Sequence, residues 1–382
     1  MNRSLESVFA VFGIMQAGGA FVPLDPKLPQ ERIEFVVQDC QIRYLICHPG
    51  LEDKVSPIVA ELSQIKAILG LKLAEFASYS WENLGEMPEL SPDQVNILEQ
   101  DLAYVMYTSG STGQPKGIMH SHYSGLSYAR LSVDLYRVLP EDRVCSHSPL
   151  HYDISTFGYF SSPLAGATSI ILPEAYTMMP ASLSQLMETE KLSIWYSVPL
   201  ALIQLQQRGV LEKRNLASLR WVLFGGEPFP PKVLGELMKV WPQAQFSNVY
   251  GPAEVNQCTF YTIPEIPKDD QAIPLGQAWD NTEIILLNEK DEEVTGQEIG
   301  EILVRSATQM RAYWNRPTLS EAAFFIREPH PGFIEKFYRT GDLARFNEKS
   351  ELLFLGRKDR QIKIRGYRVE LTEVETILMQ QI

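Results

Sequence analysis

The hydrophobic pattern changes along the chain, and the change predicts two kinds of structure. Up to about residue 265, short apolar runs that are typical of buried strands alternate with stretches of helical periodicity. Four such runs lie at 102–106, 169–172, 193–197 and 221–224. Two helical stretches lie at 181–190 and 231–240, where Ser or Pro residues favour a helix start. This alternation predicts a layered α/β architecture.

From about residue 273 the pattern becomes shorter and more regular. Runs of alternating polarity, at 283–287 and 301–304, are separated by turn residues, which is typical of strands. The last segment is charged from Arg360 and has helical periodicity from about Thr372. We therefore divide the chain into a layered α/β core at 1–265, a β-rich subdomain at 266–355 and a separate C-terminal segment at 356–382.

Composition narrows the class of protein. The 382 residues are 45% hydrophobic and 21% charged, which is ordinary for a globular protein with a large core. The net charge of −13 argues against a general nucleic-acid binder. The longest apolar stretches, such as 8–15, are too short for a membrane span, and we identify no signal peptide. The four cysteines lack zinc-like spacing with histidine, so we expect a reduced, cytoplasmic enzyme without a membrane partner.

The segment 107–117 carries the strongest indication of chemistry. It reads Tyr-Thr-Ser-Gly-Ser-Thr-Gly-Gln-Pro-Lys-Gly and directly follows the apolar run at 102–106. Glycines let successive backbone N–H groups point at one anion, while the hydroxyls and Lys116 add donors and positive charge. The spacing is not that of a Walker A loop. The segment predicts a polyphosphate site, with an ordinary solvated loop as the alternative.

This loop resembles the phosphate loop of the adenylate-forming superfamily, which includes acyl-CoA synthetases, luciferases and amino-acid adenylation domains. Three further segments follow in the order of that family. Asn-Val-Tyr-Gly-Pro-Ala-Glu at 248–254 is similar to its adenine and magnesium motif, Tyr-Arg-Thr-Gly-Asp at 338–342 to its ribose motif, and the segment 356–366 to its hinge. The resemblance covers nearly the whole chain. It implies the large N-terminal domain of this fold with a β-rich subdomain, and assigns 356–382 to the hinge and the start of a small C-terminal lid.

The resemblance also bears on the two ends of the chain. The segment 17–26 is similar to an early but not initial motif of the family, and the chain closes just past the hinge. The family's lid, with its catalytic lysine, would lie beyond Ile382. We therefore expect a fragment, or a chain expressed without the lid, that binds substrates but adenylates slowly.

The resemblance assigns ATP and Mg²⁺ to a defined set of residues. Catalysis is assigned to Lys116, Thr108 and Glu254. Nucleotide binding is assigned to Thr108, Ser109, Gly110, Ser111, Thr112, Gly113, Lys116, Tyr250, Gly251, Glu254, Asp342 and Arg357. Tyr250 can stack on adenine, Glu254 can bind Mg²⁺ beside the triphosphate, and Asp342 can accept the ribose hydroxyls. The alternatives are a core aromatic, a helix-terminal acid and a backbone cap; for Arg357 the alternative is a surface salt bridge.

Asp153 is the clearest indication of the substrate. In amino-acid adenylation domains the aspartate at this motif position pairs with the α-amine, and acyl-CoA synthetases lack it. A buried ammonium needs such a charged partner, although Asp153 could also cap the following turn. The resemblance assigns the pocket to Asp153, Ile154, Phe157, Tyr196, Leu223, Gly225, Val249, Gln257 and Cys258. The walls are uncharged, which favours a small apolar amino acid, and each wall residue could instead be plain core.

The segments 155–157, 173–177, 224–231 and 250–258 are similar to stand-alone proline-activating ligases. Those enzymes load prolyl groups onto the phosphopantetheine thiol of a peptidyl carrier protein in natural-product biosynthesis. The resemblance implies L-proline as substrate, a lid rotation near Asp359 between two half-reactions, and His151 or Tyr152 as a gate for the thiol or as packing residues. Two rival interpretations remain. One is an acyl- or aryl-CoA ligase of the same fold, and the other is a non-catalytic remnant that binds nucleotide or carrier protein.

Overall fold

The computed structural model describes residues 1–88, 91, 95–110, 114–359, 361–364, 367–371, 374–375 and 378. Three phosphate-loop residues lie outside this set, namely Ser111, Thr112 and Gly113. Much of the segment expected to be helical from Thr372 also lies outside it. Within the described residues, no helix combines the length and apolar composition needed to cross a bilayer.

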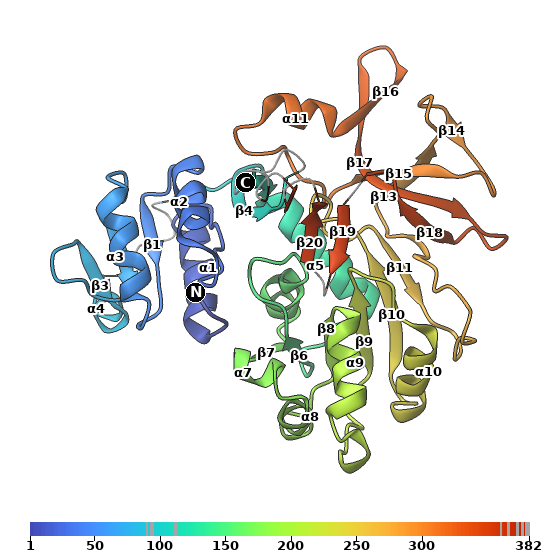
Figure 1. Ribbon diagram of the computed structural model, residues 1–382, viewed down its shortest axis with the longest axis horizontal. Helices are drawn as coiled ribbons and strands as arrows, with labels where there is room; N and C mark the ends of the chain where they lie inside the picture. Colours follow the sequence, from blue (N-terminus) through green and yellow to red (C-terminus); the bar gives the residue numbers. More distant parts are fainter. Residues whose placement is uncertain are drawn as a thin grey trace.

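The first eighty-odd residues fold as a small unit of their own, which is blue in Figure 1. Its helices are α1 (Leu5–Gln16), α2 (Gln30–Asp39), α3 (Glu52–Glu61) and α4 (Trp81–Gly85). Its strands are β1 (Tyr44–Ile46), β2 (Ala67–Gly70) and β3 (Ser78–Ser80), which pair in parallel. Apolar side chains from α2, α3 and the strands form its core, among them Val37, Ile58 and Ile68.

A two-stranded hairpin carries the phosphate loop. The antiparallel strands β4 (Leu102–Thr108) and β5 (Lys116–Ser121) flank the loop, and α5 (His122–Tyr136) follows with Ser121 as its N-cap. Gly110 and Gln114 approach closely, because a Cβ on Gly110 would lie 1.9 Å from the Gln114 carbonyl oxygen, so only glycine fits at this position. Phe21 pairs with β4 through backbone hydrogen bonds, which joins the hairpin to the N-terminal unit.

The largest sheet has the order β12-β11-β10-β9-β8-β6-β7 in the described part of the chain. Its strands are β6 (Arg143–Ser146), β7 (Thr168–Ile171), β8 (Ile194–Ser197), β9 (Trp221–Gly225), β10 (Gln245–Tyr250), β11 (Thr259–Thr262) and β12 (Gln277–Ala278). Strands β6 to β10 run parallel, and β11 and β12 add an antiparallel edge. The sheet thus extends past residue 265, to the strand at 277–278.

Helices cover this sheet, and their apolar faces supply its core. The connecting helices are η2 (Phe157–Ser161), α6 (Ser162–Leu164), α7 (Glu174–Thr177), α8 (Pro180–Thr189), α9 (Pro199–Arg208), η3 (Leu211–Lys213) and α10 (Pro231–Val240). A single cluster joins Met187 on α8, Leu202 on α9 and Leu234 on α10 to Trp195 and Phe224 on the strands. Burial of side chains of this kind contributes roughly 1.5–3 kcal/mol each to folding.

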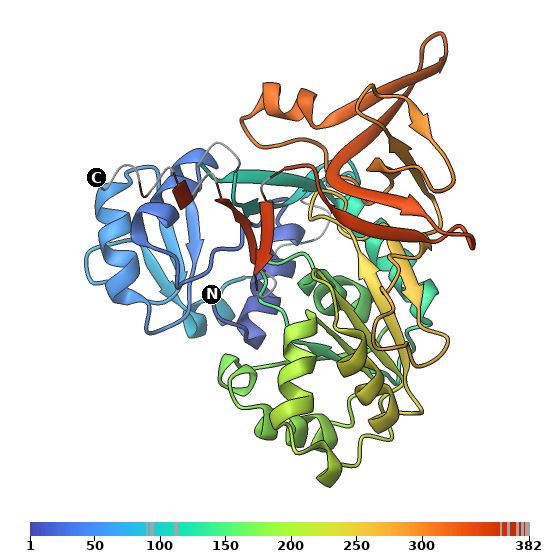
Figure 2. The ribbon, with the colours of Figure 1, turned by 45° about the vertical axis from the view of Figure 1, so that its right-hand side comes forward.

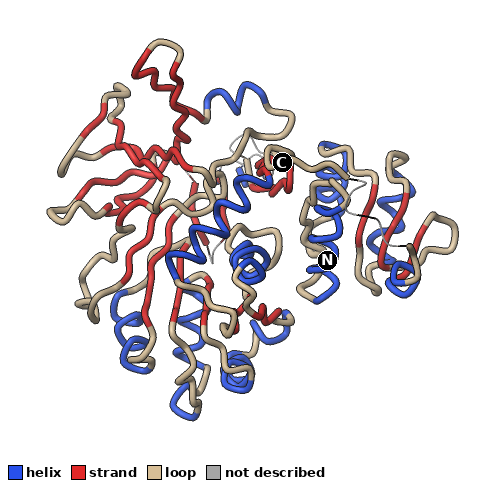
Figure 3. The backbone as a smooth tube through the Cα atoms, turned by 180° about the vertical axis from the view of Figure 1, so that it is seen from behind, coloured by secondary structure: helices blue, strands red, loops and turns tan. Residues whose placement is uncertain are grey.

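The β-rich part is antiparallel. Its strands are β13 (Thr282–Leu287), β14 (Glu293–Val294), β15 (Gly300–Ser306), β16 (Phe324–His330), β17 (Phe333–Phe346) and β18 (Leu352–Arg357), with α11 (Pro317–Ala322) before β16. A last hairpin pairs β19 (Gln361–Ile364) with β20 (Tyr367–Glu370). Figures 1 and 2 show this hairpin between the N-terminal unit and the large sheet. Figure 3 shows from behind how the strands of the β-rich part contrast with the helix-covered sheet.

The predicted elements and the fold class agree with this structure. The helix expected at 231–240 is α10, and the apolar runs expected to be strands are β4, β7, β8 and β9 within one or two residues. The predicted α/β layering is therefore confirmed. The structure adds that the first 265 residues do not share one sheet, since the N-terminal unit and the β4–β5 hairpin each form their own.

Candidate active site

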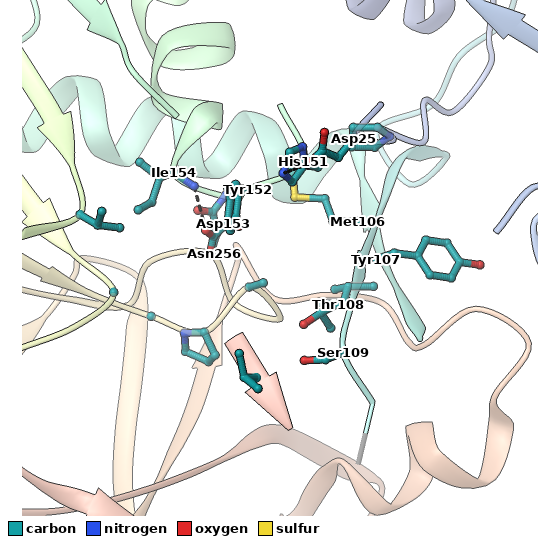
Figure 4. A pocket seen from close by; sticks show the side chains of 18 of the residues that line it. Asp25, Met106, Tyr107, Thr108, Ser109, His151, Tyr152, Asp153, Ile154 and Asn256 are labelled. Atoms are coloured by element: carbon teal, nitrogen blue, oxygen red, sulfur yellow. Dashed lines mark hydrogen bonds and ion pairs between the residues drawn. The ribbon is translucent and has the colours of Figure 1, made fainter. Parts of the chain in front are cut away.

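A cavity of about 460 Å³ opens at the carboxyl ends of the parallel strands β8, β9 and β10. This is the edge at which α/β sheets usually bind ligands. Segments far apart in sequence meet there: the end of β4, the segment 151–154, the turn after β10, and the β17–β18 pair. Figure 4 shows the cavity, with Thr108 and Ser109 on one side and Asp153 and Ile154 on the other.

The structure brings many of the residues predicted from sequence to this one cavity. Those that line it are Thr108, Ser109, Asp153, Ile154, Tyr196, Val249, Gly251, Gln257, Asp342 and Arg357. Other predicted residues lie close behind the lining or in the core, namely Gly110, Lys116, Phe157, Leu223, Gly225, Tyr250, Glu254 and Cys258. His151 and Tyr152, the expected gate, also line the cavity, with their ring centroids 4.7 Å apart.

The phosphate end of the site contains a buried ion pair. Lys116 begins β5, and its Nζ lies 3.3 Å from Oε1 of Glu254, whose side chain is fully buried. The hydroxyl of Tyr313 lies between them, accepting from Lys116 Nζ at 3.0 Å and donating to Glu254 Oε1 at 2.8 Å. Burial of two charges is tolerated only when they are paired in this way. Tyr313 was not predicted, because a tyrosine between Ala312 and Trp314 has no local pattern that distinguishes a site residue from a core residue.

The turn that carries Glu254 is tightly built. A Cβ on Gly251 would lie 2.3 Å from the Asn256 carbonyl oxygen, and Asn256 has a φ of 58°, a left-handed conformation that asparagine tolerates. The Nε2 of His120 donates to the Ala253 carbonyl at 2.9 Å, and since a carbonyl only accepts, this nitrogen carries the proton. Burial lowers the pKa of His120 to about 4, so the ring is neutral at physiological pH.

The carboxylate of Asp342 is held from two sides. Tyr250 donates its hydroxyl to Oδ2 at 2.6 Å, and Arg357 donates to Oδ1 at 2.6 Å. Asp342 and Arg357 face each other across β17 and β18, and Arg357 also makes two bonds of 2.6 and 2.7 Å to Asp359 in the predicted hinge. Burial and the negative charge of Asp342 raise the pKa of Tyr250.

Tyr250 itself lies mostly in the core. Its ring packs with Val255 and Cys258, only 7% of the residue is exposed, and it is not among the residues that line the cavity. In this structure Tyr250 therefore reaches the site through its hydroxyl on Asp342. The stacking on adenine remains a prediction.

The amino-acid end centres on Asp153. Oδ1 of Asp153 accepts from the Ile154 backbone N–H at 2.8 Å, drawn as a dashed line in Figure 4, and its carbonyl accepts from Thr156 N at 2.9 Å. The carboxylate thus caps the local turn and faces the cavity at the same time. Burial and the negative charge of Asp153 together raise the pKa of the surrounding tyrosines Tyr104 and Tyr196.

Neutral side chains form the walls beyond Asp153. Gln257 donates its amide to the Tyr196 hydroxyl, and both residues are buried and line the cavity. The other amide atom, Oε1 of Gln257, has no hydrogen-bond partner among the described residues. Phe157 packs edge-on against Tyr196 with ring centroids 5.8 Å apart, so it acts from behind the lining. Gly225 permits the close approach of β9 and β10, since a Cβ there would lie 2.2 Å from the Val249 carbonyl oxygen.

The donor set at the phosphate end suits Mg²⁺ bound together with a nucleotide. Among the residues that the structure describes, no cluster of three or more His, Cys, Asp or Glu could hold a metal ion by itself. Magnesium in nucleotide sites commonly needs only one or two carboxylates, because phosphate oxygens and water complete its shell. Glu254 supplies one such carboxylate, and the Lys116 ammonium beside it marks a place where a cation is favourable.

Comparison with known proteins agrees with this geometry. The profile of the AMP-binding enzyme family matches residues 1–314. An L-proline–[L-prolyl-carrier protein] ligase of Pseudomonas fluorescens is 31% identical over 379 residues, which are 99% of this chain and 72% of that protein. Tyrocidine synthase 3 of Brevibacillus parabrevis is 31% identical over 379 residues, which are 99% of this chain, although they span only 6% of that synthase.

Solved structures lead to the same family. The Vibrio cholerae adenylation domain AlmE, solved in complex with glycyl-adenosine-5′-phosphate, superposes with a TM-score of 0.86 at 26% identity, covering 99% of this chain and 73% of that one. This similarity confirms the predicted fold of the adenylate-forming superfamily. By sequence and by fold, the chain belongs to the family of AMP-binding enzymes.

Proposed function

We propose that this enzyme uses ATP to adenylate a small uncharged amino acid, that L-proline is the preferred substrate, and that the aminoacyl group then passes to the phosphopantetheine thiol of a carrier protein. One observation carries the proposal. Asp153 faces the same cavity as Thr108 of the phosphate loop and the Asp342 carboxylate. A cavity with these three groups can hold an amine, a triphosphate and a ribose together.

Asp153 supports an amino acid over other carboxylic acids. A substrate ammonium that leaves water for this cavity needs a negative partner to offset its desolvation. A fatty or aryl acid has no α-amine, so for such a substrate Asp153 would be a buried charge without this partner. The carboxylate therefore favours amino-acid activation over the acyl- or aryl-CoA ligase interpretation.

The reaction forms one bond to phosphorus and breaks another. A carboxylate oxygen of the amino acid attacks the α-phosphorus of ATP, and the bond from that phosphorus to the oxygen leading to the β-phosphate breaks, releasing pyrophosphate. Lys116 and the hydroxyls of Thr108 and Ser109 would hold the phosphates, and Asp342 would hold the ribose. Mg²⁺, when bound at Glu254, supplies positive charge for the departing pyrophosphate. The sulfur of the carrier thiol then attacks the carbonyl carbon of the adenylate, the bond from that carbon to the phosphate oxygen breaks, and a thioester forms with release of AMP and the thiol proton.

The walls and one relative support proline. Ile154, Val249, Tyr196 and Gln257 offer no charge to pair with a charged side chain, so Asp, Glu, Lys and Arg are disfavoured. The Pseudomonas fluorescens protein, which matches 99% of this chain, is named for its action on L-proline and a prolyl carrier protein. L-Proline fits the small, uncharged class that the walls define.

A pyrophosphate-exchange assay with a panel of carboxylic acids tests this proposal. The panel contains L-proline, D-proline, glycine, L-alanine, L-lysine, L-glutamate, benzoate and octanoate, each with ATP and Mg²⁺. We expect exchange to be fastest with L-proline and to be at background with the two acids that lack an amine. Faster exchange with benzoate or octanoate would favour the CoA-ligase interpretation. Nucleotide binding without exchange for any acid would favour a non-catalytic binding role.

A further inference from the structure

The segment 310–314 is attached to both halves of the phosphate end. Met310 N–H donates to the Glu254 carbonyl at 2.6 Å, which fixes the backbone of the glutamate. Further along, Met119 N–H donates to Ala312 at 3.0 Å and Trp314 N–H to Gly117 at 2.8 Å, so the segment runs along β5. Main-chain bonds thus hold this segment against the strand of Lys116 and the turn of Glu254 together.

Tyr313 lies at the centre of the segment, opposite Ile118 in an antiparallel bridge. Ser320 Oγ accepts from its backbone N–H at 2.9 Å, so the backbone of Tyr313 is held on the side away from β5 as well. The residue is 4% exposed, and its ring also lies 4.4 Å from Lys116 Nζ. Its hydroxyl accepts from Lys116 and donates to Glu254, which a hydroxyl can do at a single atom.

We propose that Tyr313 is a positioning residue for the cation of the ATP–Mg²⁺ complex. Its hydroxyl holds the Glu254 carboxylate in the orientation that receives Mg²⁺, and it holds Lys116 beside that carboxylate until the phosphates arrive. This inference rests on the proposed function, because it takes Glu254 as the Mg²⁺ ligand and Lys116 as a phosphate ligand.

The physical reason is an exchange of cations at one carboxylate. In the structure the Lys116 ammonium places a positive charge 3.3 Å from Oε1 of Glu254. When a triphosphate attracts Lys116, the buried Glu254 carboxylate would lose that positive neighbour at a cost, and a divalent cation would restore the balance of charge. Mg²⁺ demands nearly ideal octahedral geometry, so its affinity depends on how the Glu254 carboxylate is rotated. The hydrogen bond from Tyr313 to Oε1 limits that rotation throughout the exchange.

Tyr313→Phe separates this role from packing. The ring belongs to a buried cluster with Phe324 and Tyr338, and phenylalanine keeps that packing and the ring contact with Lys116. Only the hydroxyl is lost. Tyr159→Phe is the matched control, because Tyr159 is also buried and its hydroxyl makes a 2.9 Å bond to Ser7 on α1 rather than to Lys116 or Glu254.

The test is calorimetry of ATP binding with Mg²⁺ and with EDTA. For the parent chain we expect Mg²⁺ to increase the affinity for ATP. In Tyr313→Phe the gain from Mg²⁺ should fall on the order of tenfold, because a hydrogen bond to a charged group is lost, while the affinity in EDTA changes much less. In pyrophosphate exchange, the Mg²⁺ concentration for half-maximal rate should rise and the KM for L-proline should stay the same. Tyr159→Phe should match the parent in all of these measurements.

The outcomes that would contradict the proposed function differ from those that would contradict the role of Tyr313. If the parent chain shows no ATP binding that depends on Mg²⁺, the proposed function is wrong. If the parent shows it and Tyr313→Phe equals the parent, the role of Tyr313 is wrong while the function stands. An equal loss of affinity with and without Mg²⁺ would make Tyr313 a merely structural residue. As an independent measurement, Tyr313→Phe added to Glu254→Gln should have little further effect on the Mg²⁺ dependence, since the hydroxyl acts through that carboxylate.

Discussion

The two ends of the cavity are built on different physical principles. One end, here called the nucleotide end, comprises the phosphate end and the Asp342–Arg357 pair. Charged groups hold one another there: Lys116 with Glu254 at 3.3 Å, and Arg357 with Asp342 at 2.6 Å. At the amino-acid end, one carboxylate faces neutral walls, and those walls are fixed by aromatic packing rather than by charge.

This difference suggests that one end of the cavity serves the reaction with ATP and the other end selects the amino acid. Buried charges must be paired to be tolerated, so the nucleotide end is ordered by the protein's own ion pairs before ATP binds. The amino-acid end has its charge in Asp153 and a buried amide oxygen, Gln257 Oε1, without a partner among the described residues. Its preference therefore depends on which substrate complements a few wall residues. Substitutions at the two ends should consequently affect different measured quantities.

The largest effect is expected from Asp153→Ala. Removal of the carboxylate leaves a buried substrate ammonium without its partner, which costs about 3–5 kcal/mol. We expect amino-acid exchange to fall by roughly a hundredfold or more, whereas the affinity for ATP, measured by calorimetry, should hardly change. Asp153→Asn serves as the matched control, because it can keep the bond from Ile154 N–H and lacks only the charge. Strong exchange by either variant would contradict the assignment of Asp153 to the substrate amine.

Asp342→Ala should damage the other end. It removes the acceptor of one buried and one partly buried hydrogen bond and the group proposed to bind ribose, and the loss of a bond to a charged acceptor costs about 1.5–3 kcal/mol. Arg357 keeps its two bonds to Asp359, so its charge stays paired. We expect calorimetry to show ATP affinity lowered by tenfold or more with the relative preference among amino acids unchanged. A variant that binds ATP as the parent does would remove the ribose assignment.

Acid should lower the free energy of unfolding through His120, which bonds the turn that carries Glu254. Burial holds its pKa near 4, below the ordinary value of 6.5, although Glu254 nearby favours the charged ring. Above pH 6.5 the ring is neutral in both folded and unfolded chains, and below it the unfolded chain binds the proton first. Stability is therefore lost as pH falls from 6.5 towards 4, by at most about 1.4 kcal/mol per pH unit, and the loss reaches about 2 kcal/mol by pH 5.

His120→Gln isolates this contribution, because an amide can donate to the Ala253 carbonyl and does not titrate. Denaturant unfolding at several pH values should show an average slope between pH 6.5 and 5 that is smaller by about 1 kcal/mol per unit than in the parent. Identical slopes in the parent and the variant would show that His120 does not contribute to the acid sensitivity.

The same contrast explains how much could be predicted from sequence. Lys116, Glu254 and Asp342 lie in short motifs that can be compared along the chain, and their predicted roles came from the resemblance of those motifs, in their order, to the adenylate-forming superfamily. The strands and helices were predictable for a similar reason, since the period of apolar residues reflects local burial. α10, for example, has the predicted bounds of 231–240.

What could not be predicted depends on contacts between distant segments. Tyr313 acts on Lys116 and Glu254, which are 197 and 59 positions away, and its own neighbours in sequence give no sign of this. The placement of Tyr250 against Asp342 likewise depends on β10 and β17 meeting, 92 positions apart. The separate sheet of the N-terminal unit was missed because apolar periodicity identifies strands and not their partners.

The smallest expected effect tests the polar contact in the amino-acid pocket. Gln257→Leu removes the amide that donates to Tyr196 and leaves that buried hydroxyl short of a partner, which should cost about 1–2 kcal/mol of stability. Adding Tyr196→Phe removes the second partner, and replacement of both by apolar groups is nearly neutral, so the double variant should recover most of that loss. ATP affinity should stay unchanged in Gln257→Leu, in Tyr196→Phe and in the double variant. The relative exchange rates for L-proline and larger apolar amino acids should shift. If the stability losses of the two single variants simply add in the double variant, or if only ATP binding changes, then Gln257 and Tyr196 do not shape the pocket together. The proposed difference between the two ends of the cavity would then be wrong.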